Sequence, residues 1–194
     1  MTVIGLGHVA GVGKDVAGSA LSRDLGFRRV AFADKLRELA MTTDPLVTSQ
    51  TQSANVGVGR GRLQWVVRGM GWEEAKSVYP EVRKYLQDLG LGAREVFGED
   101  FWVDQALGSV GDDEDVVVTD VRFENEARAI KEMGGFLVRI DRPGRHPHGH
   151  RSETELATFE DWDAVVLNDQ GVVELETAIV KVAAEFAKVS EVDE

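Results

Sequence analysis

An apolar run followed by a glycine-rich loop and a Gly-Lys pair constrains the fold of this chain most. Residues 2–6 read TVIGL, and residues 5–15 read GLGHVAGVGKD. Closely spaced glycines let successive backbone N–H groups point into one concavity, which attracts anions together with the helix N-terminus behind it. A lysine at its edge reaches the terminal phosphates of a nucleoside triphosphate. The segment predicts an ATP- or GTP-binding loop and phosphoryl transfer; the alternative is a glycine-rich turn with a solvent-facing Lys14.

Two features depart from the usual loop of Gly, four residues, Gly-Lys and then Ser or Thr. His8 stands five residues before Gly13, and Gly7 precedes it, so the loop is one residue longer if Gly7 is the first glycine. Asp15 and Val16 stand where a hydroxyl group would hold Mg²⁺. The Asp15 carboxylate could bind Mg²⁺ itself or hold one of its waters, although it would also repel a triphosphate.

Length, charge and composition exclude several classes of protein. A chain of 194 residues suits one domain and buries about 70% of its unfolded surface. It has no cysteine, so disulfides and cysteine-ligated zinc are excluded. We expect neither a signal peptide nor a membrane span, because no apolar stretch approaches about 18 residues. The net charge of −12 disfavours polymeric nucleic acid as a ligand but permits a small nucleotide.

Strand-like runs alternate with helix-like segments along much of the chain. Strands are predicted at residues 3–6, 29–33, 115–119, 136–140 and 164–167, and helices at residues 14–26, 35–41, 123–133 and from about 172. Residues 116–119 are continuously β-branched, as expected for a central strand buried on both faces. The alternation predicts an α/β fold in which helices cover both faces of a parallel sheet.

Residues 41–110 interrupt this alternation. Residues 42–62 are polar and then glycine-rich, contain no strong strand pattern, and are expected to form a mobile loop. Helices are predicted at about 80–91 and 95–107. The segment is therefore interpreted as a mainly helical insertion between the second and third strands.

Charged side chains follow two of the predicted strands. Asp120 ends the buried strand, at the edge where parallel sheets bind ligands, and could hold Mg²⁺. Arg122 could reach a phosphate, and Asp34 ends the second strand at the same edge. Each aspartate could instead cap the helix that follows it.

Residues 141–151 form the clear cationic loop of this acidic chain, with arginines at 142, 145 and 151 and histidines at 146, 148 and 150. Arginines on a movable loop could neutralise the charge that develops during phosphoryl transfer. The alternate histidines could bind a metal, and the segment could also be a plain surface loop.

Taken in order, these segments resemble the deoxynucleoside monophosphate kinases of bacteriophages, a branch of the P-loop nucleotide kinases. The resemblance runs from Val3 to about Val182. It rests on GKD at 13–15, FAD at 32–34, YLQDLG at 85–90 with Arg94, FWV at 101–103, TDVRFENE at 119–126, GG at 134–135, IDRPG at 140–144, SETE at 152–155 and ND at 168–169. In that family Gly-Lys-Asp is normally followed by Thr, where this chain has Val16.

The resemblance implies a single P-loop NTPase domain of adenylate-kinase-like architecture. Its core would comprise residues of about 1–40, 111–141 and 156–194, with a monophosphate-binding helical insertion at 41–110 and an arginine-rich lid at 142–155. The implied reaction is ATP-dependent phosphorylation of deoxynucleoside 5′-monophosphates to diphosphates, with Mg²⁺. The implied partners are these nucleotides, with a homodimer by analogy, and the implied location is the cytoplasm, that of the host if the protein comes from a phage.

On this hypothesis, ATP is bound by Gly11, Val12, Gly13, Lys14, Asp15 and Val16. The monophosphate is bound by Asp34, Arg83, Gln87, Arg94, Trp102, Asp120, Arg122 and Glu153. The Mg²⁺ ligands are Asp15 and Asp120, and the catalytic residues are Lys14, Asp15, Arg122, Arg142, Arg145 and Arg151. Two alternatives stay open: a kinase of another small acceptor such as dephospho-coenzyme A, and a nucleotide-binding module that no longer catalyses, suggested by the missing hydroxyl.

Overall fold

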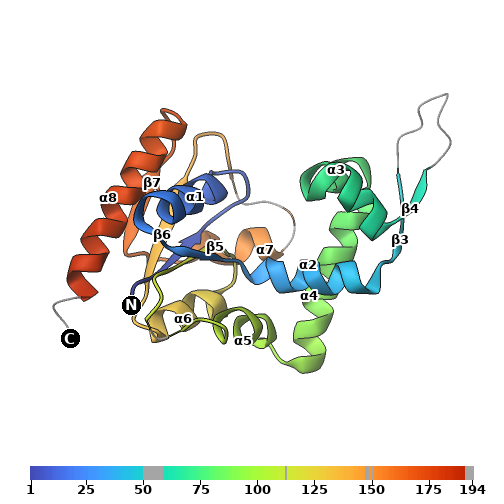
Figure 1. Ribbon diagram of the computed structural model, residues 1–194, viewed down its shortest axis with the longest axis horizontal. Helices are drawn as coiled ribbons and strands as arrows, with labels where there is room; N and C mark the ends of the chain where they lie inside the picture. The colour runs from blue at the N-terminus through green and yellow to red at the C-terminus, as the bar shows by residue number, and fades with distance from the viewer. Residues whose placement is uncertain (50–58, 112, 147–148, 150, 191–194) are drawn as a thin grey trace. The chain divides into compact units, whose positions relative to one another are not determined.

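The computed structural model describes residues 1–49, 59–111, 113–146, 149 and 151–190, and it divides into two compact units (Figure 1). The first unit comprises Met1–Phe32 and Val103–Glu194, and the second comprises Ala33–Trp102. Each unit has its own buried apolar cluster, so each is described by itself.

The first unit is built on a five-stranded sheet in which all neighbouring strands run parallel. Its strands are β1 (Val3–Gly7), β2 (Arg28–Val30), β5 (Val116–Val121), β6 (Phe136–Asp141) and β7 (Ala164–Leu167). The spatial order is β2-β5-β1-β6-β7, with Ile4 of β1 between Val117 of β5 and Phe136 of β6. Every residue of β1 is buried, as a central strand covered on both faces requires.

Helices cover both faces of this sheet, which confirms the predicted α/β fold. The helices are α1 (Lys14–Leu25), α5 (Phe101–Leu107), α6 (Glu124–Glu132), α7 (Arg151–Thr154) and α8 (Val172–Ser190), with the 3₁₀ turn η1 (Glu155–Thr158). Helices α1 and α8 share one apolar cluster with Ile4 and Val166, while α5 and α6 share the other with Val118. The predicted stripe of α8 faces inward, with Leu175 and Ile179 buried.

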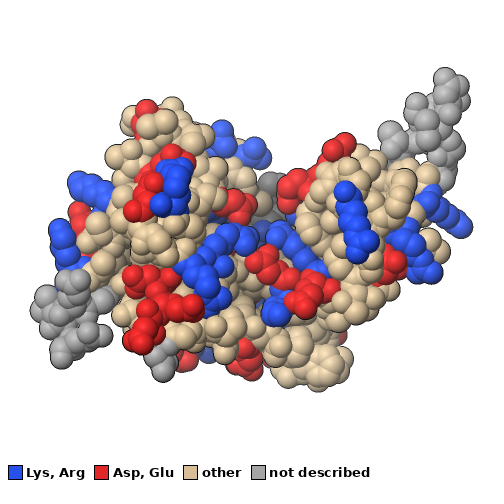
Figure 2. Space-filling view, in the orientation of Figure 1, with Lys and Arg blue, Asp and Glu red and all other residues tan. Residues whose placement is uncertain are grey.

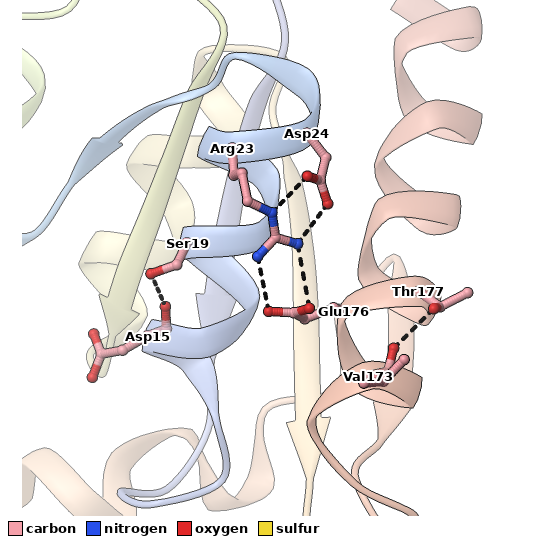
Figure 3. A network of polar contacts seen from close by, with 7 residues as sticks. All are labelled: Asp15, Ser19, Arg23, Asp24, Val173, Glu176 and Thr177. Atoms are coloured by element: carbon pink, nitrogen blue, oxygen red, sulfur yellow. Dashed lines mark hydrogen bonds and ion pairs between the residues drawn. The ribbon is translucent and has the colours of Figure 1, made fainter.

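A polar contact network joins α1 to α8 at the surface of the first unit (Figure 3). The Arg23 guanidinium donates to Asp24 Oδ1 and Oδ2 at 2.7 Å, and to Glu176 Oε1 at 3.1 Å. All three side chains are exposed or half-buried, so the network adds little to the packing of Leu21 and Ile179 beneath it.

The second unit is mainly helical. It contains α2 (Phe32–Thr43), α3 (Leu63–Val78), α4 (Pro80–Phe97) and a ribbon of two antiparallel strands, β3 (Leu46–Thr48) and β4 (Arg60–Arg62). Its core is formed by Ala40, Val47, Leu63, Val66, Val67, Ala75, Tyr79 and Val82. The expectation of a mobile loop without strands at 42–62 is wrong at both ends, where β3 pairs with β4. These strands lack a strong sequence pattern because backbone pairing does not need apolar side chains. Residues 50–58 lie outside the described part of the chain.

Three predicted boundaries also differ. Helix α4 continues through Gly90 and Gly92 to Phe97 and ends before Gly98. The φ of 108° at Gly98 is unfavourable for any residue that has a Cβ. The second strand ends at Val30 because Phe32 already opens α2. The second unit begins at Ala33 and not at residue 41, and α5 packs with the first unit from Val103 onward. No helix within the described ranges is long and apolar enough to cross a membrane.

Two helical glycines provide a matched test of this packing. A Cβ on Gly18 of α1 would lie 2.3 Å from Thr119 Cγ2 on β5, whereas a Cβ on Gly92 of α4 would meet nothing within 4 Å. We expect Gly18→Ala to lower the free energy of unfolding by about 1–3 kcal/mol through overpacking. Gly92→Ala should raise it by about 0.5–1 kcal/mol, because alanine is the better helix former. Calorimetry and denaturant titration would check both, and shifts of the same sign would contradict the close α1–β5 contact.

Candidate active site

The loop between β1 and α1, residues 8–13, is called the phosphate loop below. It contains positive φ angles of 89° at His8, 75° at Gly11 and 110° at Gly13. A Cβ on Gly13 would lie 2.7 Å from Leu175 Cδ2 and 2.8 Å from Asn168 Nδ2, so both the backbone angle and the space require glycine. Successive turns of this kind direct backbone N–H groups into one concavity.

His8 occupies the first position of the loop. Gly7 still belongs to β1, where it pairs with Val121 and Arg139, and the chain leaves the strand at His8 with a positive φ. The spacing from His8 to Gly13 is therefore the usual one, with a histidine in place of the leading glycine. Of the two interpretations of the loop length, the structure favours the shorter.

Lys14 is buried at the base of the phosphate loop. Its Nζ donates to the carbonyl oxygen of His8 at 2.8 Å and to that of Val9 at 2.5 Å. The interpretation of Lys14 as a solvent-facing residue is therefore wrong, since its exposed fraction is 7%. Gly13 precedes α1 without a side-chain cap, so the first-turn amides and the helix dipole suit an anion.

Asn168 fixes the other end of the phosphate loop. It follows β7, and its Nδ2 donates to the Val12 carbonyl at 2.8 Å, while its backbone N–H donates to Asp141 O at 2.7 Å. The sequence analysis included Asn168 in a motif without giving it a role. Its position after the last strand, at the ligand-binding edge of a parallel sheet, was the available signal.

The first part of the cationic segment, residues 142–146, is called the arginine loop and lies against the phosphate loop. Arg142 Nη1 donates to Gly11 O at 3.4 Å, and the Arg145 guanidinium carbon is 3.4 Å from the place of a Cβ on Gly11. Arg151 instead pairs with Glu155 and stacks over the Phe123 ring at 5.7 Å. Two of the three predicted arginines thus adjoin the loop.

The metal-binding alternative for the histidines has no support in the described residues. Nowhere within them do three histidine or acidic side chains gather as metal ligands would. His148 and His150 lie outside the described part of the chain, as does the side chain of Glu153.

The predicted acidic residues have distinct surroundings. The Asp15 carboxylate is 89% exposed in the first turn of α1, with Arg29 Nη2 at 4.0 Å. Asp120 Oδ1 accepts a hydrogen bond from Phe32 N at 2.8 Å and so caps α2. Helix α6 is capped by Glu126, whose Oε2 accepts from the Phe123 and Arg122 amides at 3.1 and 2.8 Å.

Three predicted acceptor residues lie on one face of α4. Arg83, Gln87 and Arg94 are separated by four and seven residues, which aligns them along the helix. Arg94 is buried and its Nη1 donates to Glu99 O at 3.0 Å. Trp102 is also buried, and its Nε1 donates to Gly90 O at 2.9 Å, so this indole is hydrogen-bonded to the backbone of α4.

Arg37 is a candidate that the sequence analysis missed. Its Nη1 donates to Asp34 Oδ1 at 3.2 Å, so Asp34 lies within the first turn of α2 and is not its cap. The guanidinium lies 6.0 Å from the Trp72 ring centre, and its buried Nε has no hydrogen-bond partner among the described residues. Such an unpaired donor is costly unless a ligand satisfies it. The spacing of three residues from Asp34 on one helix was the available signal.

The charges around Arg37 are coupled to those of α3 and α4. A hydrogen bond from Lys76 holds the pKa of Glu73 below its usual value, and Arg37 and Arg83 lower it further. Arg37, Trp72 and Arg83 therefore combine cationic donors with an aromatic surface in the second unit. On the face shown in Figure 2, acidic and basic side chains are intermixed on both units.

Comparisons with known proteins give a consistent result. Residues 68–179 match the family model described as deoxynucleotide monophosphate kinase. A protein of Acanthamoeba polyphaga mimivirus, provisionally named a deoxynucleotide monophosphate kinase, is 32% identical over 195 residues, covering 93% of this chain and 95% of that protein. Protein ORF77 of Ictalurid herpesvirus 1 (strain Auburn), uncharacterized by name, is 33% identical over 110 residues, covering 52% of this chain and 47% of its own length.

Solved structures resemble the chain more distantly. A sugar kinase from Janibacter sp. HTCC2649 has a TM-score of 0.41 and 14% identity, over 97% of this chain and 95% of its own. Dephospho-CoA kinase from Campylobacter jejuni has a TM-score of 0.43 and 14% identity, over 95% of this chain and 97% of its own. At these values neither structure bears on the substrate.

The bond from Asn168 to the phosphate loop can be tested by an isosteric change. Asn168→Asp keeps the shape of the side chain but replaces the donor to Val12 O by an acceptor. We expect both Asn168→Asp and Asn168→Ala to lower the free energy of unfolding by about 1–3 kcal/mol, because Val12 O loses its partner. Thr177→Ala, at an exposed position of α8, is the control and should change the free energy of unfolding by less than about 0.5 kcal/mol. Wild-type stability of Asn168→Asp in calorimetry would contradict this role.

Proposed function

The chain belongs to the deoxynucleotide monophosphate kinase family, and on this basis we propose that it transfers the γ-phosphoryl group of ATP to the 5′-phosphate of a deoxynucleoside monophosphate. The products are ADP and a deoxynucleoside diphosphate. The observation that carries the proposal is the phosphate loop, in which positive φ angles at His8, Gly11 and Gly13 precede buried Lys14 at a helix N-terminus.

The donor residues of the proposal lie in the first unit. The amides of residues 11–16 would bind the triphosphate, and the Lys14 ammonium would exchange the carbonyl oxygens of His8 and Val9 for phosphate oxygens. Arg142 and Arg145, next to Gly11, would neutralise charge on the transferring group. Such transfer needs little covalent help, so positioning and charge neutralisation supply most of the rate.

Mg²⁺ fits the proposal through the exposed Asp15 carboxylate, since Mg²⁺ prefers carboxylate and phosphate oxygens. Asp15 and Asp120 are the proposed ligands. A bound Mg²⁺ would neutralise charge on the β- and γ-phosphates. This assignment gives the acidic residue at position 15 the role that a hydroxyl usually has.

The acceptor residues of the proposal lie mainly in the second unit. The unpaired Arg37 Nε and the exposed Arg83 are proposed to bind the monophosphate, and the Trp72 ring offers a surface for stacking. The Asp34 carboxylate accepts a hydrogen bond from Arg37 and so orients it. Gln87 and Arg94 of α4, with Trp102 of α5, are the other proposed monophosphate-binding residues of this unit. Arg122 and Glu153 belong to the first unit, and their roles toward the monophosphate remain predictions from the family resemblance.

Lys14→Ala tests the donor loop. We expect ADP production in the presence of acceptor to fall by about a hundredfold or more, because a preorganised charge near the transferring group is lost. Lys181→Ala, an exposed lysine of α8, is the matched control and should retain wild-type turnover. Full activity of Lys14→Ala in a coupled ADP assay would remove the assignment of the phosphate loop.

Arg37→Ala tests the acceptor side. We expect the KM for the monophosphate to rise by about tenfold to a hundredfold, as for the loss of a charge-assisted bond to phosphate, with the KM for ATP nearly unchanged. Arg68→Ala, an exposed arginine of α3, is the control. An unchanged acceptor KM would exclude Arg37 from the acceptor site.

The same assay, with a panel of acceptors, distinguishes the alternatives. It compares common deoxy- and ribonucleoside monophosphates, dephospho-coenzyme A and no acceptor. ADP formation that depends on a deoxynucleoside monophosphate supports the proposal, and dependence on dephospho-coenzyme A alone would replace the substrate. ATP binding without any ADP would indicate a non-catalytic module.

A further inference from the structure

His8 combines an unfavourable backbone conformation with a specific side-chain contact. Its φ of 89° is one that a Cβ makes unfavourable, and glycine would adopt it freely. The imidazole is nevertheless buried, with an exposed side-chain fraction of 9%, and its Nδ1 lies 2.9 Å from Asp141 Oδ1. This is an ion-pair distance without full hydrogen-bond geometry. At that separation a bare nitrogen and a carboxylate oxygen would repel, which assigns the proton to Nδ1.

Asp141 is the point at which several contacts of the first unit meet. Its Oδ1 also accepts from Arg139 Nε at 2.7 Å, and its backbone carbonyl accepts from Asn168 N at 2.7 Å. Asn168 in turn holds Val12 O, near the end of the phosphate loop. Asp141 thus contacts the start of that loop through His8 and its end through Asn168.

Asp141 is also the residue from which the arginine loop begins. It ends β6, and Arg142 follows it directly and reaches Gly11 O at 3.4 Å. Any displacement of the Asp141 side chain and backbone therefore shifts the root of the segment that carries Arg142 and Arg145. The two loops share a single anchor on the sheet.

We propose that His8 is a positioning residue that links the phosphate loop to the root of the arginine loop through Asp141, and so holds Arg142 and Arg145 in register with the bound phosphates. Where it concerns catalysis, this inference rests on the proposed function. The contact itself does not depend on it, because His8 and Asp141 lie 2.9 Å apart whatever reaction the protein catalyses.

Burial and charge support the same assignment. Desolvation, followed by the positive charge of Arg139, lowers the pKa of His8 below 6.5. Asp141 and a hydrogen bond with the backbone of Ile140 oppose these effects, and Lys14 adds a small lowering. The lowered pKa favours the neutral imidazole, and the contact with Asp141 favours a tautomer with the N–H on Nδ1. A neutral donor links the two loops without adding a positive charge beside Lys14.

Two substitutions at position 8 separate the link from the backbone strain. Asparagine tolerates a positive φ. Its amide nitrogen is bonded to Cγ, as Nδ1 is in histidine, so His8→Asn keeps a donor at the same distance along the side chain. His8→Gly relieves the strain and removes the donor. Asp141→Ala and the double variant His8→Gly/Asp141→Ala complete a cycle, and Arg23→Ala, in the α1–α8 network of Figure 3, is the control.

The first readout needs no kinase activity. The specificity of trypsin allows cleavage after Arg145, whereas Pro143 protects the bond after Arg142, so limited proteolysis of the protein without added nucleotide reports on the arginine loop. We expect cleavage after Arg145, measured by mass spectrometry, to be about tenfold faster in His8→Gly and Asp141→Ala than in the wild-type protein, since the root of the loop opens more often. The double variant should be no faster than either single variant, and His8→Asn and Arg23→Ala should cleave at the wild-type rate.

The second readout is kinetic. We expect His8→Gly to reduce kcat about tenfold while the KM for ATP changes less than about threefold, because the arginines are misplaced and the nucleotide site is retained. His8→Asn should restore kcat. Wild-type cleavage and kcat in His8→Gly, or additive effects in the double variant, would overturn the proposal. Absence of transfer to any acceptor in the wild-type protein would refute the proposed function alone, since the cleavage experiment still tests the link.

Discussion

The structure of the first unit depends on the requirement that no side chain stands at Gly13. Leu175 of α8 and Asn168 after β7 occupy the space that a Cβ would take, so the loop, the last strand and the last helix meet at one glycine. This contact sets where α1 begins and which amides are left without a cap. The paired strands β1 and β6 fix the loop. His8 directly follows β1 and Asp141 ends β6, so both contacting residues are held by the same sheet.

Much of the first unit could be predicted from the sequence, because its signals are local. The continuous β-branched run of β5 and the glycine stops after α1 and α6 each determine an element without help from distant residues. In the second unit the signals are weaker. The RGR sequence of β4 has no apolar alternation, so only its pairing with β3 makes it a strand. Helix α4 passes through two glycines because the packing of Val82 and Ala93 overrides their low propensity.

The candidate site shows the same division between local and tertiary information. Lys14 and the positive-φ glycines were found because their spacing along the chain is itself the signal. Arg37 was missed because the features that make it a candidate are tertiary, namely the nearby Trp72 ring and an Nε without a hydrogen-bond partner among the described residues. Asp120 was located at the correct strand end, but the helix that it caps is α2, more than eighty positions earlier. The residues next to Asp120 in the sequence do not indicate a hydrogen bond from its carboxylate to a residue so distant along the chain.

The burial of Lys14 against its own loop has a consequence for ligand selection. Its ammonium donates to two carbonyl oxygens of the phosphate loop, so an anion that binds Lys14 must replace these two bonds. A single inorganic anion offers few contacts in exchange for them. On the proposed function, a triphosphate would offer oxygens to the lysine and to several amides at once, and so would gain more contacts than it displaces. The loop would then select a polyphosphate chain over the small inorganic anions in solution.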